Sequence, residues 1–124
     1  MCVNGRSFVV EQFETGEGGH DPGNPTVALT PDVSITELPL QTLGPKAIDS
    51  KTLPDPFTAL YVCKLTGAEA VGTLSNFLLI ARINFSPIPS DPLVNTFFAY
   101  AIANLPMQNK LAGEEKEFDI YVNF

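Results

Sequence analysis

The chain has 124 residues, a length typical of one domain and sufficient to bury a core without disulfide bonds. Its 14 acidic and 7 basic residues give a formal net charge of -7, which argues against binding to nucleic acid or to anionic membranes. Charged residues make up only 17%, below the usual share of about 25%, so we expect part of the surface to be covered.

Eleven prolines and nine glycines interrupt every long segment, a pattern that favours short strands joined by turns over long helices. In chain order, the sequence predicts strands at Arg6–Phe13, Thr26–Thr30, Val33–Leu40, Thr58–Thr66, Asn76–Phe85, Thr96–Leu105 and Glu117–Phe124. Segments 14–25 and 41–56 are predicted to be loops or arms because polar residues, glycine and proline punctuate them. We therefore expect a single all-β domain over residues 1–124, an antiparallel β-sandwich or small barrel with an irregular N-terminal third.

The strand at Thr96–Leu105 is predicted from its aromatic residues, although its alanines would also suit a helix. Strict alternation would place one set of its side chains on one face, namely Phe97, Ala99, Ala101, Ala103 and Leu105. The other face would then carry Phe98, Tyr100, Ile102 and Asn104.

Charge is scarce in the second half of the chain. Between Val71 and Leu105 the only charged residues are Arg82 and Asp91, and two predicted strands carry apolar side chains on both faces. A half-exposed antiparallel sheet shows polar residues on its outer face, so these strands are expected to be covered on both sides. A second subunit or long loops of the same chain could cover them, and Arg82 would need a carboxylate partner. The residues expected at a subunit interface are Phe77, Leu79, Ile80, Arg82, Phe97, Phe98, Tyr100 and Ile102.

Residues with catalytic or metal-binding chemistry are few. The only histidine, His20, lies in a glycine-rich segment and would need a cysteine or a serine beside it to act in nucleophilic catalysis. Glu17, His20 and Asp21 carry suitable ligand atoms but match no known metal-binding spacing. Cys63 lies in an apolar run and is expected to be a buried, inert thiol. We therefore expect no enzymatic activity, no cofactor and no metal.

The N-terminal region is acidic: between Ser7 and Pro45 there are six carboxylates and no lysine or arginine. It could be a solvated arm or could meet a basic groove on a neighbour. The first residues lack the apolar core of a signal peptide, and an apolar run such as Phe77–Ala81 is too short to span a bilayer.

Three segments carry a resemblance to a known class of proteins: Ser34-Ile-Thr-Glu-Leu38, Asn76-Phe-Leu-Leu-Ile-Ala-Arg-Ile-Asn-Phe85 and Glu117-Phe-Asp-Ile-Tyr-Val-Asn-Phe124. Together they resemble small β-rich virion proteins of tailed bacteriophages, of the tail, tail-fibre-attachment or head-decoration type. The resemblance spans about half of the chain and carries over no functional residues. It implies a structural subunit that partners copies of itself or other virion proteins, in a virion assembled in the host cytoplasm. The alternative is a monomeric binding module that holds a ligand in an apolar pocket near Phe97, Phe98 and Tyr100.

Overall fold

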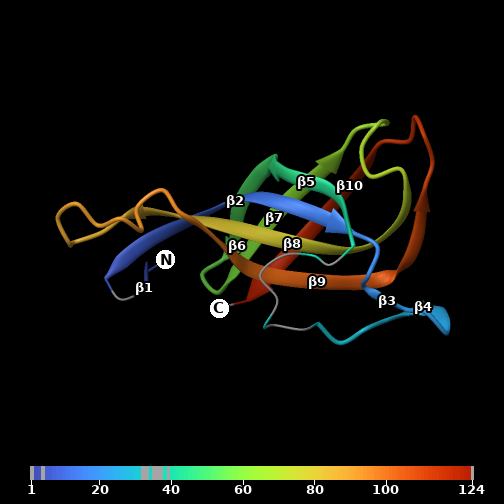
Figure 1. Cartoon of the computed structure of the whole chain (residues 1–124), viewed down its shortest axis with the longest axis horizontal. Coiled ribbons are helices and arrows are strands. Elements are labelled where there is room, and N and C mark those ends of the chain that lie inside the picture. The colour runs from blue at the N-terminus through green and yellow to red at the C-terminus, as the bar shows by residue number, and fades with distance from the viewer. Residues whose placement is uncertain (1, 4, 32–33, 35–37, 39, 124) are drawn as a thin grey trace.

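The computed structural model describes residues 2–3, 5–31, 34, 38 and 40–123. Every regular element in this part of the chain is a β-strand (Figure 1). The strands are β1 (Cys2–Val3), β2 (Arg6–Gly16), β3 (His20–Asp21), β4 (Asn24–Ala28), β5 (Gln41–Ala47), β6 (Ser50–Asp55), β7 (Thr58–Leu65), β8 (Gly72–Phe85), β9 (Phe97–Lys110) and β10 (Lys116–Asn123).

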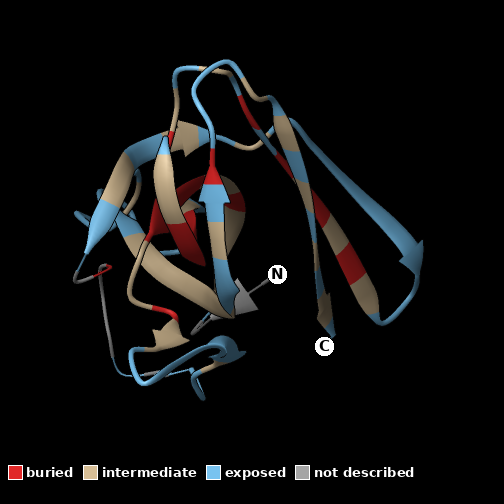
Figure 2. Cartoon of the chain, turned by 90° about the vertical axis from the view of Figure 1, so that its right-hand side faces the viewer, coloured by how far each residue is buried: buried red, intermediate tan, exposed pale blue. Residues whose placement is uncertain are grey.

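The strands form antiparallel sheets. The largest has the order β1-β2-β8-β9, with β5 paired to β2 as a fifth strand. A three-stranded sheet has the order β10-β7-β6, and β3 and β4 form a short hairpin. The two larger sheets pack against each other around shared apolar side chains, and the buried residues lie where they face each other (Figure 2). This confirms the predicted all-β class and is consistent with a β-sandwich; the described strands do not close into a barrel.

Alternation of apolar and polar residues places β7 and β10 in the main core as predicted. The buried side chains of β7 are Ala59, Tyr61, Cys63 and Leu65. The side chains of β10 that pack against them are Phe118, Ile120 and Val122, with more exposed residues between them. The Phe118 ring lies 4.7 Å from the Phe77 ring, centroid to centroid, so the two sheets contact through aromatic groups at this point.

Strand β8 lies between β2 and β9 and is buried on both faces from Leu74 to Ala81. Its side chains at Phe77, Leu79 and Ala81 enter the main core. Leu78 and Ile80 point the other way, into a second apolar cluster with Leu38, Ala99 and Ile102. The chain itself therefore covers both faces of this strand, as in the alternative that needs no second subunit.

A β-bulge in β9 overturns the predicted alternation. Leu79 pairs with Ala101 but Ile80 pairs with Ala99, so Tyr100 is the extra residue. A bulge turns two successive side chains to the same face, and both Tyr100 and Ala101 pack against the main core. The side chains of β9 that reach the main core are Phe98, Tyr100, Ala101, Ala103 and Leu105, whereas Ala99 and Ile102 belong to the second cluster.

The prediction that 41–56 is a loop or arm is wrong, because this segment forms both β5 and β6. The loop was predicted because of Pro45 and Pro54, since proline cannot donate a hydrogen bond to a neighbouring strand. Both strands lie at sheet edges: β5 pairs only with β2, and β6 only with β7. An edge strand has one side without a strand partner, where proline is tolerated.

The segment 14–25 is also more regular than predicted, since β2 continues to Gly16 and β3 and β4 follow closely. Glycine here serves close packing: a Cβ atom at Gly19 would collide with the carbonyl of Ser75 in β8. The predicted irregular N-terminal third therefore includes a long central strand, β2. The predicted strand Val33–Leu40 lies outside the described residues apart from Ser34, Leu38 and Leu40.

Candidate functional site

Large apolar side chains gather at the end of the molecule formed by the β8–β9 connection. Figure 1 shows this connection extending at the left beyond the three-stranded sheet. Its exposed apolar residues are Phe85 (57% exposed), Ile88 (52%), Leu93 (42%) and Phe97 (51%). We call the surface formed by these four side chains the apolar end. Single exposed apolar residues are common on protein surfaces, but four large ones on one connection and the strand ends beside it make this end a candidate binding surface.

A hollow of about 550 Å³ opens beside these side chains. It is lined by Arg6, Phe8, Ile83, Leu93, Thr96, Phe97 and Phe98. The rings of Phe8 and Phe98 meet edge to face with their centroids 5.3 Å apart and join this lining to the main core. The volume lies within the range of about 300–1,000 Å³ that small-molecule sites occupy, and the lining is mostly apolar.

An ion pair between β2 and the β8–β9 connection holds one wall of the hollow. Arg6 Nε donates to Asp91 Oδ2 at 2.6 Å, and the Asp91 side chain is only 3% exposed. The backbone N–H of Leu93 donates to the other carboxylate oxygen at 3.1 Å. The Arg6 guanidinium, followed by hydrogen bonds from Ser86 and Leu93, lowers the pKa of Asp91 to about 2. The carboxylate is therefore ionised and satisfied within the chain.

A second ion pair lies on β2 and β8 near the same end. Arg82 Nε donates to Glu11 Oε1 at 2.7 Å, and Nη2 lies 3.3 Å from Oε2, so the contact is bidentate. Arg82 Nη1 also donates to Asn95 Oδ1 at 2.9 Å, and the hydrogen bond to Glu11 raises the pKa of the arginine. The prediction that Arg82 requires a carboxylate is confirmed, and its partner belongs to the same chain.

The β8–β9 connection is itself well ordered by hydrogen bonds. Asn95 N–H donates to Ile83 O at 2.7 Å, and Ile83 N–H donates to Thr96 O at 3.1 Å, which closes the connection at its base. Gly5, in the turn after β1, packs so closely that an added Cβ would lie 3.3 Å from the Pro87 ring. The exposed apolar side chains are therefore carried by a braced loop.

The eight predicted interface residues divide into three groups. Phe77, Leu79 and Ile80 are buried within the chain and present almost no surface to a partner, so their assignment to an interface is corrected. Tyr100 and Ile102 are half-buried and pack against the main core and the second cluster. Phe97, Phe98 and Arg82 lie at or beside the apolar end.

Phe85, Ile88 and Leu93 were not among the predicted site residues. The available signal was the presence of apolar side chains at Ile88 and Leu93 within a proline-rich connector, where polar residues are usual.

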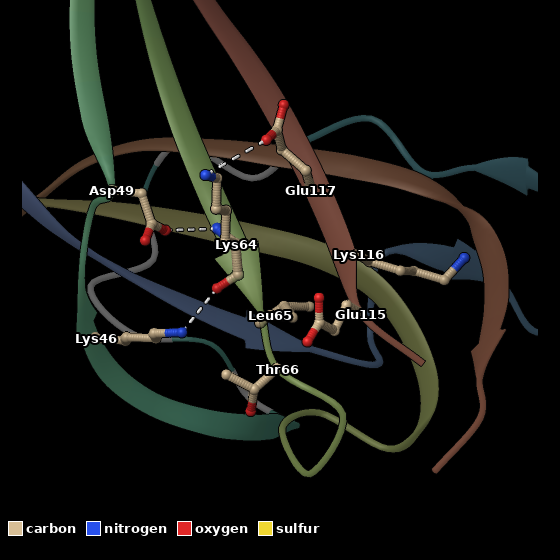
Figure 3. A pocket seen from close by; sticks show the side chains of 8 residues that line it. All are labelled: Lys46, Asp49, Lys64, Leu65, Thr66, Glu115, Lys116 and Glu117. Carbon is tan, nitrogen blue, oxygen red and sulfur yellow. Dashed lines mark hydrogen bonds and ion pairs between the residues drawn. The ribbon is translucent and has the colours of Figure 1, made fainter. Parts of the chain in front are cut away.

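The opposite end of the sandwich carries a charged hollow of about 500 Å³ (Figure 3). Its lining holds three lysines and three carboxylates, together with Leu65 and Thr66: Lys46, Lys64, Lys116, Asp49, Glu115 and Glu117. Lys46 Nζ donates to Lys64 O at 2.8 Å and to Glu69 Oε1 at 2.6 Å, and this contact lowers the pKa of Glu69. Asp49 accepts the Lys64 backbone N–H at 2.7 Å. The lining thus holds equal numbers of lysines and carboxylates, and Lys46 and Asp49 are tied to the chain itself.

Two turns close this same end. Gly113 N–H donates to Gly67 O at 2.8 Å, and the backbones are so close that a Cβ at Gly67 would lie 2.8 Å from the Gly113 Cα. Lys110, which is 1% exposed, donates from Nζ to Thr66 O at 2.8 Å. Backbone and lysine contacts therefore hold the two turns of this end together.

A serine does lie beside the single histidine, but in a position that does not suit catalysis. His20 Nδ1 lies 3.0 Å from Ser75 Oγ, which also accepts the Gly19 N–H at 2.8 Å. Ser75 is fully buried, so a substrate has no access to its hydroxyl. The pair fastens the β3 segment to β8. Among the described residues, no group of three or more His, Cys, Asp or Glu could hold a metal ion.

The buried thiol is confirmed at Cys63, which is fully buried in β7. Burial raises the pKa of this thiol to about 12, with smaller contributions from Asp49 and Asp119. A neutral, inaccessible thiol is a poor nucleophile.

Comparison with known proteins gives no relative for this chain: no protein-family model matches the sequence, and no curated protein matches it. The described part of the chain contains no helix of the length and apolar character needed to cross a membrane. The class that can be stated is an all-β protein of packed antiparallel sheets with one apolar end and one charged end.

Proposed function

We propose that the chain is a non-enzymatic structural subunit of a multimeric assembly and docks through its apolar end. The observation that carries this proposal is the exposure of Phe85, Ile88, Leu93 and Phe97 on the β8–β9 connection and the strand ends beside it. With about 150–250 Å² for a whole aromatic side chain, the four expose on the order of 400 Å². The largest apolar patch on a typical monomer is about 300–600 Å² and is often functional.

The assembly that we propose is a phage virion, with the chain in a tail or capsid-associated position. The resemblance of three segments to small virion proteins of tailed phages suggests it, and a small β-rich subunit with a docking end suits such a particle. Partners in this proposal are copies of the chain or other virion structural proteins, brought together in the host cytoplasm.

The absence of enzymatic activity is part of the proposal and has support from two side chains. Ser75, the hydroxyl beside His20, is fully buried, and the Cys63 thiol is buried with a pKa raised to about 12. Neither nucleophile is accessible to a substrate in the folded chain.

Sedimentation of the chain in extracts of its own source cells tests the structural role. The tagged parent should move with large assemblies, whereas Phe97→Asp should remain in the low-mass fractions because a charge at the apolar end opposes docking. Leu53→Asp is the matched control, since Leu53 is also exposed but belongs to β6. The proposal fails if the parent stays in the low-mass fractions, or if both variants still move with the assemblies.

The hollow beside the apolar end favours a second candidate, the monomeric binding module with an apolar ligand. Phe97 and Phe98 line it as that alternative requires, but Tyr100 does not and instead packs against the main core. The fluorescent probe 1-anilinonaphthalene-8-sulfonate should then bind a monomer saturably at one site. Leu93→Asp should abolish this binding and Leu111→Asp, at an exposed site elsewhere, should not. Equal binding by both variants would exclude the module.

A further inference from the structure

Strand β10 forms one edge of the three-stranded sheet and has a regular backbone (Figure 1). In the described part of the chain β7 is the one strand that pairs with it, and the register runs without a shift from Lys116 to Asn123. Two other edge strands differ: β6 carries Pro54 and one register shift, and β5 carries Pro45 and two. Proline and bulges keep an edge from pairing with a further strand, and β10 has neither. This edge is therefore open to strand addition.

The direction of the backbone groups in β7 can be read from its contacts on the other side. Val62 O accepts the Asp49 N–H at 2.9 Å, and the Lys64 N–H donates to Asp49 Oδ2 at 2.7 Å. Asp49 comes immediately before β6, so the even-numbered residues of β7 direct their backbone groups toward β6. Backbone groups alternate in direction along an antiparallel strand, and the odd-numbered residues of β7 therefore bond to β10.

This alternation decides which groups of β10 remain for a further strand. The partners of the odd-numbered residues of β7 include Phe118, Ile120 and Val122, so the backbone groups of these three residues are used within the sheet. The residues that direct their N–H and C=O groups to the free edge are Glu117, Asp119, Tyr121 and Asn123. An extended segment laid along β10 would form main-chain hydrogen bonds with them.

The inner face of β10 sets the first requirement on such a segment. Phe118, Ile120 and Val122 pack against the main core but are only half-buried. Side chains directly opposite each other on neighbouring strands contact each other on the same face of the sheet. The added segment would therefore cover these three with apolar side chains at alternate positions.

The outer face sets the second requirement, which is charge. Glu117 and Asp119 are exposed and two positions apart, so their side chains lie on the same face. Glu117 lies 3.9 Å from Lys64, and both of these side chains are more than half exposed, so this pair contributes little. Among the described lysines and arginines, none forms an ion pair with Asp119. The two carboxylates favour lysine or arginine opposite them on an added strand.

A second copy of this chain does not meet these requirements. Its 7 basic residues are scattered and no two of them are two positions apart; the closest are Lys46 and Lys51. A second β10 would bring its own carboxylates to the same edge, where like charges opposite each other repel. The partner that fits is a different protein.

We infer that β10 receives an extended segment of another protein, in which lysine or arginine alternates with apolar residues, as a fourth strand of this sheet. Main-chain hydrogen bonds hold the segment, and its side chains match β10 on both faces. This contact surface is separate from the apolar end, and the inference does not depend on docking there.

Fluorescence anisotropy with synthetic peptides tests the inference on the purified full chain. The probe is a labelled peptide as long as β10 in which valine alternates with lysine, and its control alternates valine with glutamate. The first should bind saturably at one site, and the second should not bind. Methylating the backbone nitrogens of one alternate set of residues in the probe should abolish binding, whereas methylating the other set should not, because one set alone bonds to β10.

A matched pair of double variants tests the charges. Glu117→Gln combined with Asp119→Asn should weaken the dissociation constant of the probe about tenfold, since two opposite-charge pairs are lost. Glu17→Gln combined with Asp21→Asn changes the net charge equally at sites outside β10 and should leave it unchanged. Asparagine at position 21 keeps an oxygen that can accept the turn N–H that Asp21 accepts.

Amide exchange followed by nuclear magnetic resonance locates the contact. The N–H groups of Asp119 and Tyr121 should exchange more slowly when the valine–lysine probe is bound, while those of Lys51 and Leu53 in β6 should not change. The inference is overturned if this probe does not bind, if both methylated forms bind equally, or if the slowed amides lie in β6. Equal weakening by the two double variants would also overturn it, because the probe would then respond to net charge and not to this edge.

Discussion

Leu78 and Leu79 are neighbours in β8, and their side chains enter different apolar clusters. Both are at most 2% exposed. Replacing a buried leucine by alanine costs about 2–5 kcal/mol, and the cost rises with the cavity that remains. We expect Leu79→Ala to fall in the upper part of this range because the main core is large and spans two sheets. Leu78→Ala should fall in the lower part because its cluster is small.

Urea denaturation at low protein concentration measures both losses. A domain of ordinary stability has about 5–15 kcal/mol, so a loss of 3 kcal/mol, taken as roughly the middle of the leucine range, moves the urea midpoint by on the order of 1–2 M. Leu53→Ala, at a site 61% exposed, is the control and should change stability by no more than about 0.5 kcal/mol. If Leu78→Ala behaves like the control while Leu79→Ala is severe, the chain does not cover the second face of β8 by itself. That face would then have to be reconsidered as a surface for a partner.

Three further predictions concern single titratable groups. The pKa of Asp91 is lowered from 3.8 to about 2, so its pair with Arg6 stabilises the fold above about pH 4 and is lost as the pH falls toward 2. Asp91→Asn should flatten this part of the stability curve measured by denaturation, and an unchanged curve would refute the pairing. In a Cys2→Ser background, Cys63 should resist thiol reagents at about pH 8 until the protein unfolds; rapid reaction of the native protein would show that the thiol is accessible. His20→Ala should fold and associate like the parent, at a cost of about 1 kcal/mol in thermal denaturation for the lost hydrogen bond. A variant that stays folded but loses a measurable turnover would contradict the non-enzymatic proposal.

The sequence predicts strands well where one face packs on a core and the other meets solvent. In β7 and β10 this asymmetry imposes a period of two, which is visible in Tyr61, Cys63, Phe118 and Ile120. In β8 both faces are covered, so apolar residues alone cannot tell a second subunit from the rest of the same chain. Leu38, distant in sequence, decides the matter because it packs on the second face of β8.

Other features depend on tertiary relationships that composition does not contain. The bulge at Tyr100 adds one residue to β9 without altering its apolar character. The side chains from Ala101 onward therefore face opposite to strict alternation, and the sequence gives no sign of this change. Pro45 and Pro54 resemble loop residues until their strands are known to lie at sheet edges.

The candidate site was predicted only in part for the same reason. Phe97 and Phe98 were expected at a pocket or interface, whereas the exposure of Phe85 and Ile88 follows from where one sheet extends beyond the other.

The charged end limits what docking through the apolar end alone can build. If the partner were a second copy about a two-fold axis, the contact would occupy the same surface on both chains and leave neither with a free apolar end. At the other end, Gly67 and Gly113 are in backbone contact and Lys46 is engaged with Glu69. A subunit of a large assembly therefore has to meet further neighbours through the faces or edges of its sheets.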